Sequence, residues 1–257
     1  YVLACLTLRD RLWAIFVTAV FIVSRSTTEI FSMVWSEPVF TPLALATMIL
    51  LVIGYKRRNI SMAIACAVGV TTAAALSVRY SGALLVVASA IVVVFTPPRK
   101  LDRKLARGAA LVVPSLIVLG VVGTLNRAQG DGYFGARYPS SRSLQGTIQS
   151  AVDAIGSTLI WRGTTSGTIL IGSVVVTMAV VGAWWGLIRR QSSIVLATFT
   201  GVYLVGLTIG QSSTRLDDAS ERLGYPVYLP LLILAAWGLR VMMSIVRSQM
   251  HSRWPLL

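Results

Sequence analysis

Residues 38–58 read PVFTPLALATMILLVIGYKRR, and this stretch decides the fold class. Residues 38–55 carry no charged side chain and come close to the ~20 residues that an α-helix needs to cross a bilayer. Three basic residues, Lys56, Arg57 and Arg58, follow at once. An apolar run that ends in a basic cluster is typical of a membrane-spanning helix that reaches the cytoplasmic face.

The same pattern recurs along the chain, which is 55% hydrophobic and has a mean hydropathy of +0.76. A water-facing domain of this composition would be insoluble, so the bilayer is its solvent. We therefore predict an all-α integral membrane protein with about eight transmembrane helices, forming one polytopic domain over residues 1–257. Besides 38–55, the predicted spans are 12–23, 60–78, 81–96, 108–125, 168–188, 192–211 and 226–246.

Positive charge is concentrated on one side of this predicted arrangement. If each apolar segment crosses once, 15 basic residues share one face with Asp10 and Asp102, which gives a net charge of +13. The other face carries 8 arginines and 7 acidic residues, a net charge of +1. The positive-inside rule then makes the basic face cytoplasmic, so we expect a multi-pass protein of the cell membrane with both termini of the chain in the cytoplasm. The total of +14 thus reflects topology, and no nucleic-acid partner is needed to explain it.

The chain opens with a short apolar stub, residues 2–6, which is too short to cross a bilayer. Charges follow this stub, whereas a signal peptide carries them in front. We expect the stub to end a preceding helix and the chain to be the C-terminal part of a longer membrane protein. Cys5 and Cys66 lie in apolar segments, where a thiol behaves as a small hydrophobe, so we expect no disulfide, no metal site and no cofactor.

Four polar stretches face the extracytoplasmic side in this topology, namely residues 24–37, 78–81, 126–167 and 212–225. Most of the acidic residues lie there, which marks either a polar cavity or ordinary solvated loops. The stretch 126–167 is the long extracytoplasmic loop. Within it, apolar residues at helical spacing over 144–160 predict one interfacial helix.

Two charged residues on this face have alternative interpretations. Glu37 precedes Pro38, so it is either a helix-start acid that complements the helix dipole or a functional acid that binds sugar hydroxyls or orients a neighbouring arginine. Arg79 lies in a very tight connection near membrane depth. There it either extends toward lipid phosphates or lines a pocket for an anionic group, because its planar fork of donors suits phosphate.

Three short motifs, WSEPVF (35–40), LSVRYSG (76–82) and ERLGYPVY (221–228), carry a resemblance to a known family. The chain resembles the polytopic C-type glycosyltransferases that use polyprenyl-phosphate sugars, the mannosyltransferase and aminoarabinose-transferase-like group. Members of that group show an S-E-P-like helix start, an R-Y/P-x-G turn and an R-Y-x-x-P-like entry to a late helix. In this chain Tyr225 follows Arg222 by three residues, whereas the family pattern places a tyrosine directly after the arginine.

The resemblance implies transfer of a sugar from a polyprenyl-phosphate donor to an extracytoplasmic acceptor, with the lipid phosphate as leaving group. It also implies that the general base lies in an extracytoplasmic loop upstream of Tyr1. Developing charge on the phosphate needs cationic stabilisation, a role for Arg79 and Arg222, while Glu29 and Glu37 would hydrogen-bond the sugar or acceptor. The implied substrate-binding set is Glu29, Glu37, Arg79, Tyr80, Arg222 and Tyr225. Of these, the four charged residues are expected to lie around one outward-facing pocket.

Two other classes of protein fit the same residues. In a lipid or solute transporter or flippase, the arginines would attract a lipid head group without any chemistry. A non-catalytic membrane subunit would need the spans but not the site. In each case the partners are membrane lipids, and for the transferase also a polyprenyl-phosphate-linked sugar.

Overall fold

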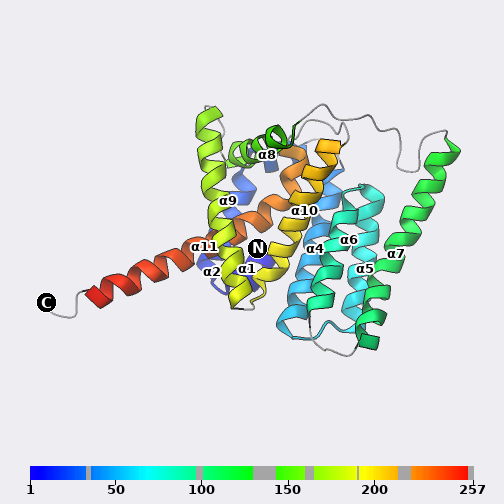
Figure 1. Ribbon diagram of the computed structural model, residues 1–257, viewed down its shortest axis with the longest axis horizontal. Coiled ribbons are helices and arrows are strands. Elements are labelled where there is room, and N and C mark those ends of the chain that lie inside the picture. The colour runs from blue at the N-terminus through cyan, green and yellow to red at the C-terminus, as the bar shows by residue number, and fades with distance from the viewer. Residues whose placement is uncertain are drawn as a thin grey trace.

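The computed structural model describes residues 1–32, 36–96, 101–129, 143–159, 165–189, 191–213 and 221–253, and its regular elements in these ranges are all helices (Figure 1). The first part of the chain forms α1 (Val2–Leu8), α2 (Arg11–Val23), α3 (Arg25–Ser32), α4 (Glu37–Lys56), α5 (Met62–Val78) and α6 (Gly82–Phe95). The second part forms α7 (Leu101–Ala128), α8 (Leu144–Leu159), α9 (Thr165–Ile188), α10 (Ser193–Ser213) and α11 (Glu221–Arg253).

Short polar residues between the apolar segments set several of the helix starts. The carboxylate of Asp10 accepts hydrogen bonds from the amides of Leu12 and Trp13 and so caps α2. Ser61 caps α5 by accepting from the Ile64 amide at 3.2 Å. These caps satisfy backbone donors that the first turn of a helix leaves without a partner.

Within the described residues, five helices are long and apolar enough to cross a membrane, so the chain is an all-helical multi-pass membrane protein. They are Glu37–Lys56, Leu101–Ala128, Ser166–Ile188, Ser193–Gln211 and Tyr225–Ser248. Three further apolar helices, Arg11–Val23, Met62–Val78 and Gly82–Phe95, are shorter. Large apolar side chains lie on the outside of this bundle, as lipid contact requires, and two of them, Leu170 and Trp184, are each 65% exposed.

Each of the eight apolar segments coincides with a helix, although the sequence misplaces several helix ends. The stretch 126–167 is not one continuous loop, because α7 continues to Ala128, α9 starts at Thr165 and α8 (Leu144–Leu159) lies between them. The predicted helix over 144–160 is confirmed as α8. The polar stretch 24–37 contains the helix α3, which begins at Arg25, and residues 33–35 lie outside the described residues.

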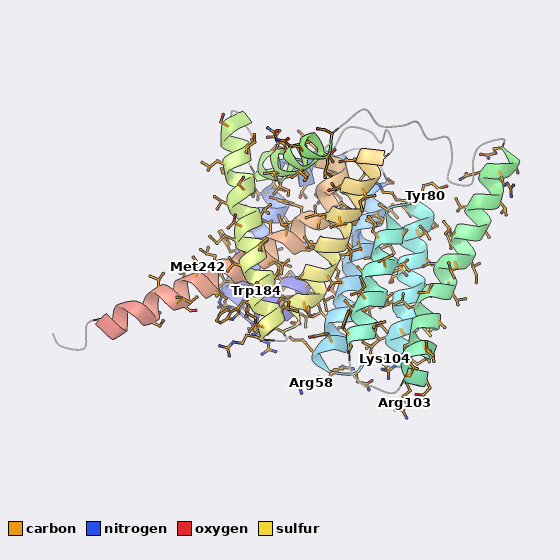
Figure 2. All side chains as sticks on the ribbon, viewed as in Figure 1. Arg58, Tyr80, Arg103, Lys104, Trp184 and Met242 are labelled. Carbon is orange, nitrogen blue, oxygen red and sulfur yellow. The ribbon has the colours of Figure 1, made fainter. Side chains whose placement is uncertain are left out.

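The bundle has two distinct ends. Figure 1 shows α4, α5, α6 and α7 side by side, with α8 lying across one end of the neighbouring helices. Arg58, Arg103 and Lys104 lie together at the other end (Figure 2), which we call the basic end. There the Arg107 guanidinium donates to the Asn59 side-chain oxygen at 2.9 Å and links the two basic connections. Tyr80 is at the opposite end, as the alternating topology requires.

The helices approach each other closely where glycines replace larger residues. A Cβ on Gly182 of α9 would lie 2.1 Å from the Leu234 carbonyl oxygen of α11, and one on Gly238 would lie 2.0 Å from that of Met178. No side chain fits at such separations. The small residues of α9 therefore serve packing inside the chain, and they hold α11 against α9.

Candidate functional site

A buried ion pair joins α4 to the end of α5. The Nη1 of Arg79 donates to Oε1 of Glu37 at 2.8 Å. The Glu37 side chain is 0% exposed and that of Arg79 is 16% exposed, so the pair is largely shielded from solvent. A charge-assisted hydrogen bond of this length holds the Arg79 guanidinium at the Glu37 carboxylate.

The local fold explains why these two residues meet. Glu37 is the first residue of α4, where its charge also complements the helix dipole, and Arg79 is the first residue after α5. Its extended backbone (φ −158°, ψ 135°) turns the chain out of the helix. A tight turn then leads into α6 at Gly82, whose Cβ would lie 2.5 Å from the Leu76 amide nitrogen, so only glycine fits there.

Three buried hydroxyls belong to the segments around the ion pair. Tyr203 of α10 is 0% exposed, and its hydroxyl lies in the region of Ser81, Arg79 and Glu37. Thr41 lies one turn beyond Glu37 on α4 and is 4% exposed. Among the described residues these three hydroxyls are buried without a partner at hydrogen-bond distance. Unsatisfied buried hydroxyls are rare, and they are available to a bound water or ligand group.

A second polar contact ties α11 to α3. The Tyr225 hydroxyl donates to Oγ1 of Thr27 at 3.0 Å, and Thr27 in turn donates to the Phe21 carbonyl at 2.6 Å. The Tyr225 ring is 1% exposed and lies against Phe21 and Phe31. Tyr225 therefore has a defined packing role in this structure.

The remaining candidates lie in different surroundings. Tyr80 is 37% exposed and its hydroxyl accepts a hydrogen bond from Asn126 of α7, so it faces away from the packed interior. Glu29 is half-buried on α3, a helix that contacts α4 and α11. Arg222 belongs to the first turn of α11, and its side chain lies outside the described residues. The structure thus brings Glu37 and Arg79 together and places Tyr225 beside α3.

The pair has a clear chemical capacity. A guanidinium has five N–H donors, and within the described part of the chain Arg79 gives one of them to Glu37. An arginine held in place by a carboxylate, with donors to spare and partial access, can bind a phosphate oxygen in a bidentate way. The buried hydroxyls of Ser81 and Tyr203 add neutral donors and acceptors to the same region.

Tyr203, Ser81 and Thr41 were not identified from the sequence as site residues. A tyrosine or threonine inside an apolar helix has the same local pattern whether it packs or binds. The only sequence feature that could have indicated these site residues was the hydroxyl group itself, because a buried hydroxyl in a membrane-spanning segment requires a hydrogen-bond partner.

Comparison with protein-family models, with curated proteins and with solved structures gives no match for this chain. The resemblance to the C-type glycosyltransferases therefore rests on the three motifs alone.

Proposed function

We propose that this protein is a membrane glycosyltransferase, or the membrane-embedded part of one, that transfers a sugar from a polyprenyl-phosphate donor to an acceptor on the extracytoplasmic side. The observation that carries the proposal is the Arg79–Glu37 pair at the end of α5. Arg79 directly precedes Tyr80, which Figure 2 shows at the end of the bundle opposite the basic end. The Arg79 guanidinium keeps partial exposure and donors that Glu37 does not occupy.

In the proposed reaction Arg79 binds the phosphate that links the sugar to its lipid. As the bond between the sugar carbon and the phosphate oxygen breaks, negative charge develops on the leaving phosphate. A preorganised cation next to it lowers the barrier, because no solvent or side chain has to reorganise at that moment. Glu37 acts through Arg79 as a positioning residue, which is one of the two functional roles open to it from the sequence.

The topology completes the proposal. The chain crosses the membrane eight times, with the basic end in the cytoplasm, so that the pair lies near the extracytoplasmic surface. Arg222 supplies a second cation from the start of α11, while Glu29 of α3 hydrogen-bonds the sugar or acceptor. The general base comes from another part of the complete protein.

Transfer from a polyprenyl-phosphate sugar, measured with the complete protein reconstituted in lipid, tests the proposal. We expect Arg79→Ala and Arg222→Ala to lose most of the activity, since removing a charge-assisted contact from a partly desolvated site costs about 2–5 kcal/mol. Arg79→Lys should recover only part of it, because a point charge cannot reproduce the bidentate fork.

Arg127→Ala is the matched control, because Arg127 is an exposed cation near the end of α7, on the same side of the bundle as Tyr80. An exposed charge of this kind contributes under about 1 kcal/mol. Wild-type transfer rates in correctly inserted Arg79→Ala and Arg222→Ala proteins would remove both arginines from the mechanism.

A further inference from the structure

An apolar groove runs along α11 between α2 and α9. Both of these helices pack against α11, and the groove has a volume of about 200 Å³ and only apolar residues in its lining. Its buried residues form the floor, where Val17, Leu232 and Ala236 are 3%, 8% and 7% exposed. At the rim, Phe16 and Val174 are 59% and 51% exposed. The groove is therefore open to the outside of the bundle, where a membrane protein meets lipid.

Small side chains on α11 and close backbone packing create the groove. Ala235 and Ala236 line it with a single methyl group each. Met178 of α9 also lines it, and the Met178 carbonyl oxygen lies so near α11 that a Cβ on Gly238 would be 2.0 Å from it. The backbone contact fixes α9 beside the groove. An apolar cavity of roughly 150 Å³ is large enough to bind benzene, so this groove has room for a stretch of an acyl chain.

One end of the groove lies at the turn between α1 and α2. Trp13 and Leu239 line the groove at this end. The Trp13 amide donates to the Asp10 carboxylate at 3.3 Å, and Leu239 is followed by Arg240. The Nη1 of Arg240 donates to the Leu8 carbonyl at 3.0 Å and lies 3.4 Å from Oδ2 of Asp10. Charged groups therefore adjoin this end, and a tryptophan here suits the level of lipid head groups.

The net charge beside this end of the groove is positive. Arg9 and Arg11 flank Asp10 in the turn, and both are exposed. Together with Arg240 they form what we call the arginine cluster, in which three cations adjoin one carboxylate and leave an excess of two positive charges. Lys56 of α4 lies in the region of Arg9 and adds to the excess. This charge complements an anionic group better than a zwitterionic one.

We propose that the groove and the arginine cluster bind one anionic phospholipid, with an acyl chain in the groove and the lipid phosphate at the cluster. An anionic phospholipid carries both parts that this arrangement recognises, whereas free phosphate lacks the chain and a zwitterionic lipid lacks the net charge. The planar donor fork of arginine suits phosphate. The cluster belongs to the predicted basic face of the chain, so the lipid comes from the cytoplasmic leaflet. Its binding does not depend on Arg79 or on the proposed transferase activity.

Native mass spectrometry of the whole chain in detergent micelles tests the proposal, because it separates the first bound lipid from later ones. The protein is titrated with phosphatidylglycerol and with phosphatidylcholine that carry the same acyl chains. We expect the first phosphatidylglycerol to bind at least about tenfold more tightly than the first phosphatidylcholine, since only the former has a net negative charge. Glycerophosphoglycerol, the same head group without acyl chains, should not compete.

Two variants test the two halves of the site. Ala235→Phe fills the groove and should weaken binding of the first phosphatidylglycerol about tenfold, since it displaces several methylenes of the chain. Its control is Val205→Phe, which places the same side chain on an exposed part of α10. Arg11→Gln should weaken binding about fivefold, and its control is Arg103→Gln, an exposed cation on α7. Because the Arg11 side chain is exposed, this variant decides the matter even where Ala235→Phe does not fold.

Three results would overturn the proposal. The first is equal affinity of the wild-type protein for phosphatidylglycerol and phosphatidylcholine. The second is wild-type binding by folded Ala235→Phe protein or by Arg11→Gln protein. The third is a protein dimer that forms in place of lipid binding and is lost in Ala235→Phe, which would assign the groove to a second copy of the chain.

Discussion

Neutralising Glu37 should destabilise the protein far more than neutralising an exposed carboxylate. The Glu37 side chain is fully buried, and its partner Arg79 is 16% exposed, so Glu37→Gln leaves a largely buried cation beside a neutral amide. Removing one partner of a buried ion pair costs about 3–5 kcal/mol. We expect a loss in this range when the purified protein is unfolded by SDS in mixed micelles and followed by tryptophan fluorescence.

The double variant Glu37→Gln/Arg79→Met separates a structural role of the pair from a functional one. Replacing both charges by groups of similar volume should recover most of the lost stability, because a buried pair contributes little net free energy once its desolvation is counted. Substrate binding and transfer should not recover, since the phosphate-binding cation is gone. A double variant that regains both stability and full activity would show that the pair only holds α4 to α5.

Asp10→Asn is the matched control. Asp10 faces Arg240 at 3.4 Å, but the two side chains are 30% and 36% exposed, so the ion pair is worth under about 1 kcal/mol. Asparagine is as good a helix cap as aspartate, so α2 keeps its N-terminal hydrogen bonds. If Glu37→Gln lowers the free energy of unfolding no more than Asp10→Asn does, the inferred burial of the Glu37–Arg79 pair is wrong.

Three further predictions concern packing and topology. Gly182→Ala should destabilise the protein by about 1–3 kcal/mol, because the added methyl group would contact the backbone of α11. Gly120 has open space around it, so Gly120→Ala should be neutral or slightly stabilising, and SDS unfolding measures both free energies. Lys104 and Gln129 lie near opposite ends of α7, about 37 Å apart. An impermeant thiol reagent applied to intact cells should therefore label the Gln129→Cys protein and not the Lys104→Cys protein. The reverse labelling pattern would invert the proposed topology. Tyr225→Phe removes the hydrogen bond to α3 and should lower stability by about 0.5–1.5 kcal/mol without changing the fold, and an unchanged SDS midpoint would show that the hydroxyl contributes nothing.

Local patterns predicted the helices well. A run of apolar residues between basic or turn-forming residues gives the same helix whatever its neighbours are, which is why all eight apolar segments are helical. The contact between Glu37 and Arg79 could also be predicted from the sequence, because α4 and α5 form an antiparallel pair and the two residues lie at the same end of it.

Contacts that depend on helix rotation and tilt were not predictable. The side of α10 that faces α4 decides whether Tyr203 lies in the site or among lipids, and the apolar sequence of α10 is compatible with either. The hydrogen bond from Tyr225 to Thr27 joins residues far apart in the chain, so no local sequence pattern indicates it. The close approach of α9 and α11 depends on glycines whose importance shows only when the opposing backbone is in place.

Binding of a polyprenyl phosphate tests the central claim most directly. The wild-type protein in nanodiscs should retain the phosphorylated lipid in native mass spectrometry, and the matched polyprenol without phosphate should not displace it. Arg79→Gln should weaken binding by at least about tenfold, since a charge-assisted contact is lost, while Arg127→Gln on α7 should bind as the wild type does. Equal retention of the phosphate by folded Arg79→Gln and wild-type protein, or equal binding of the polyprenol, would contradict the assignment of this site to a lipid-linked phosphate.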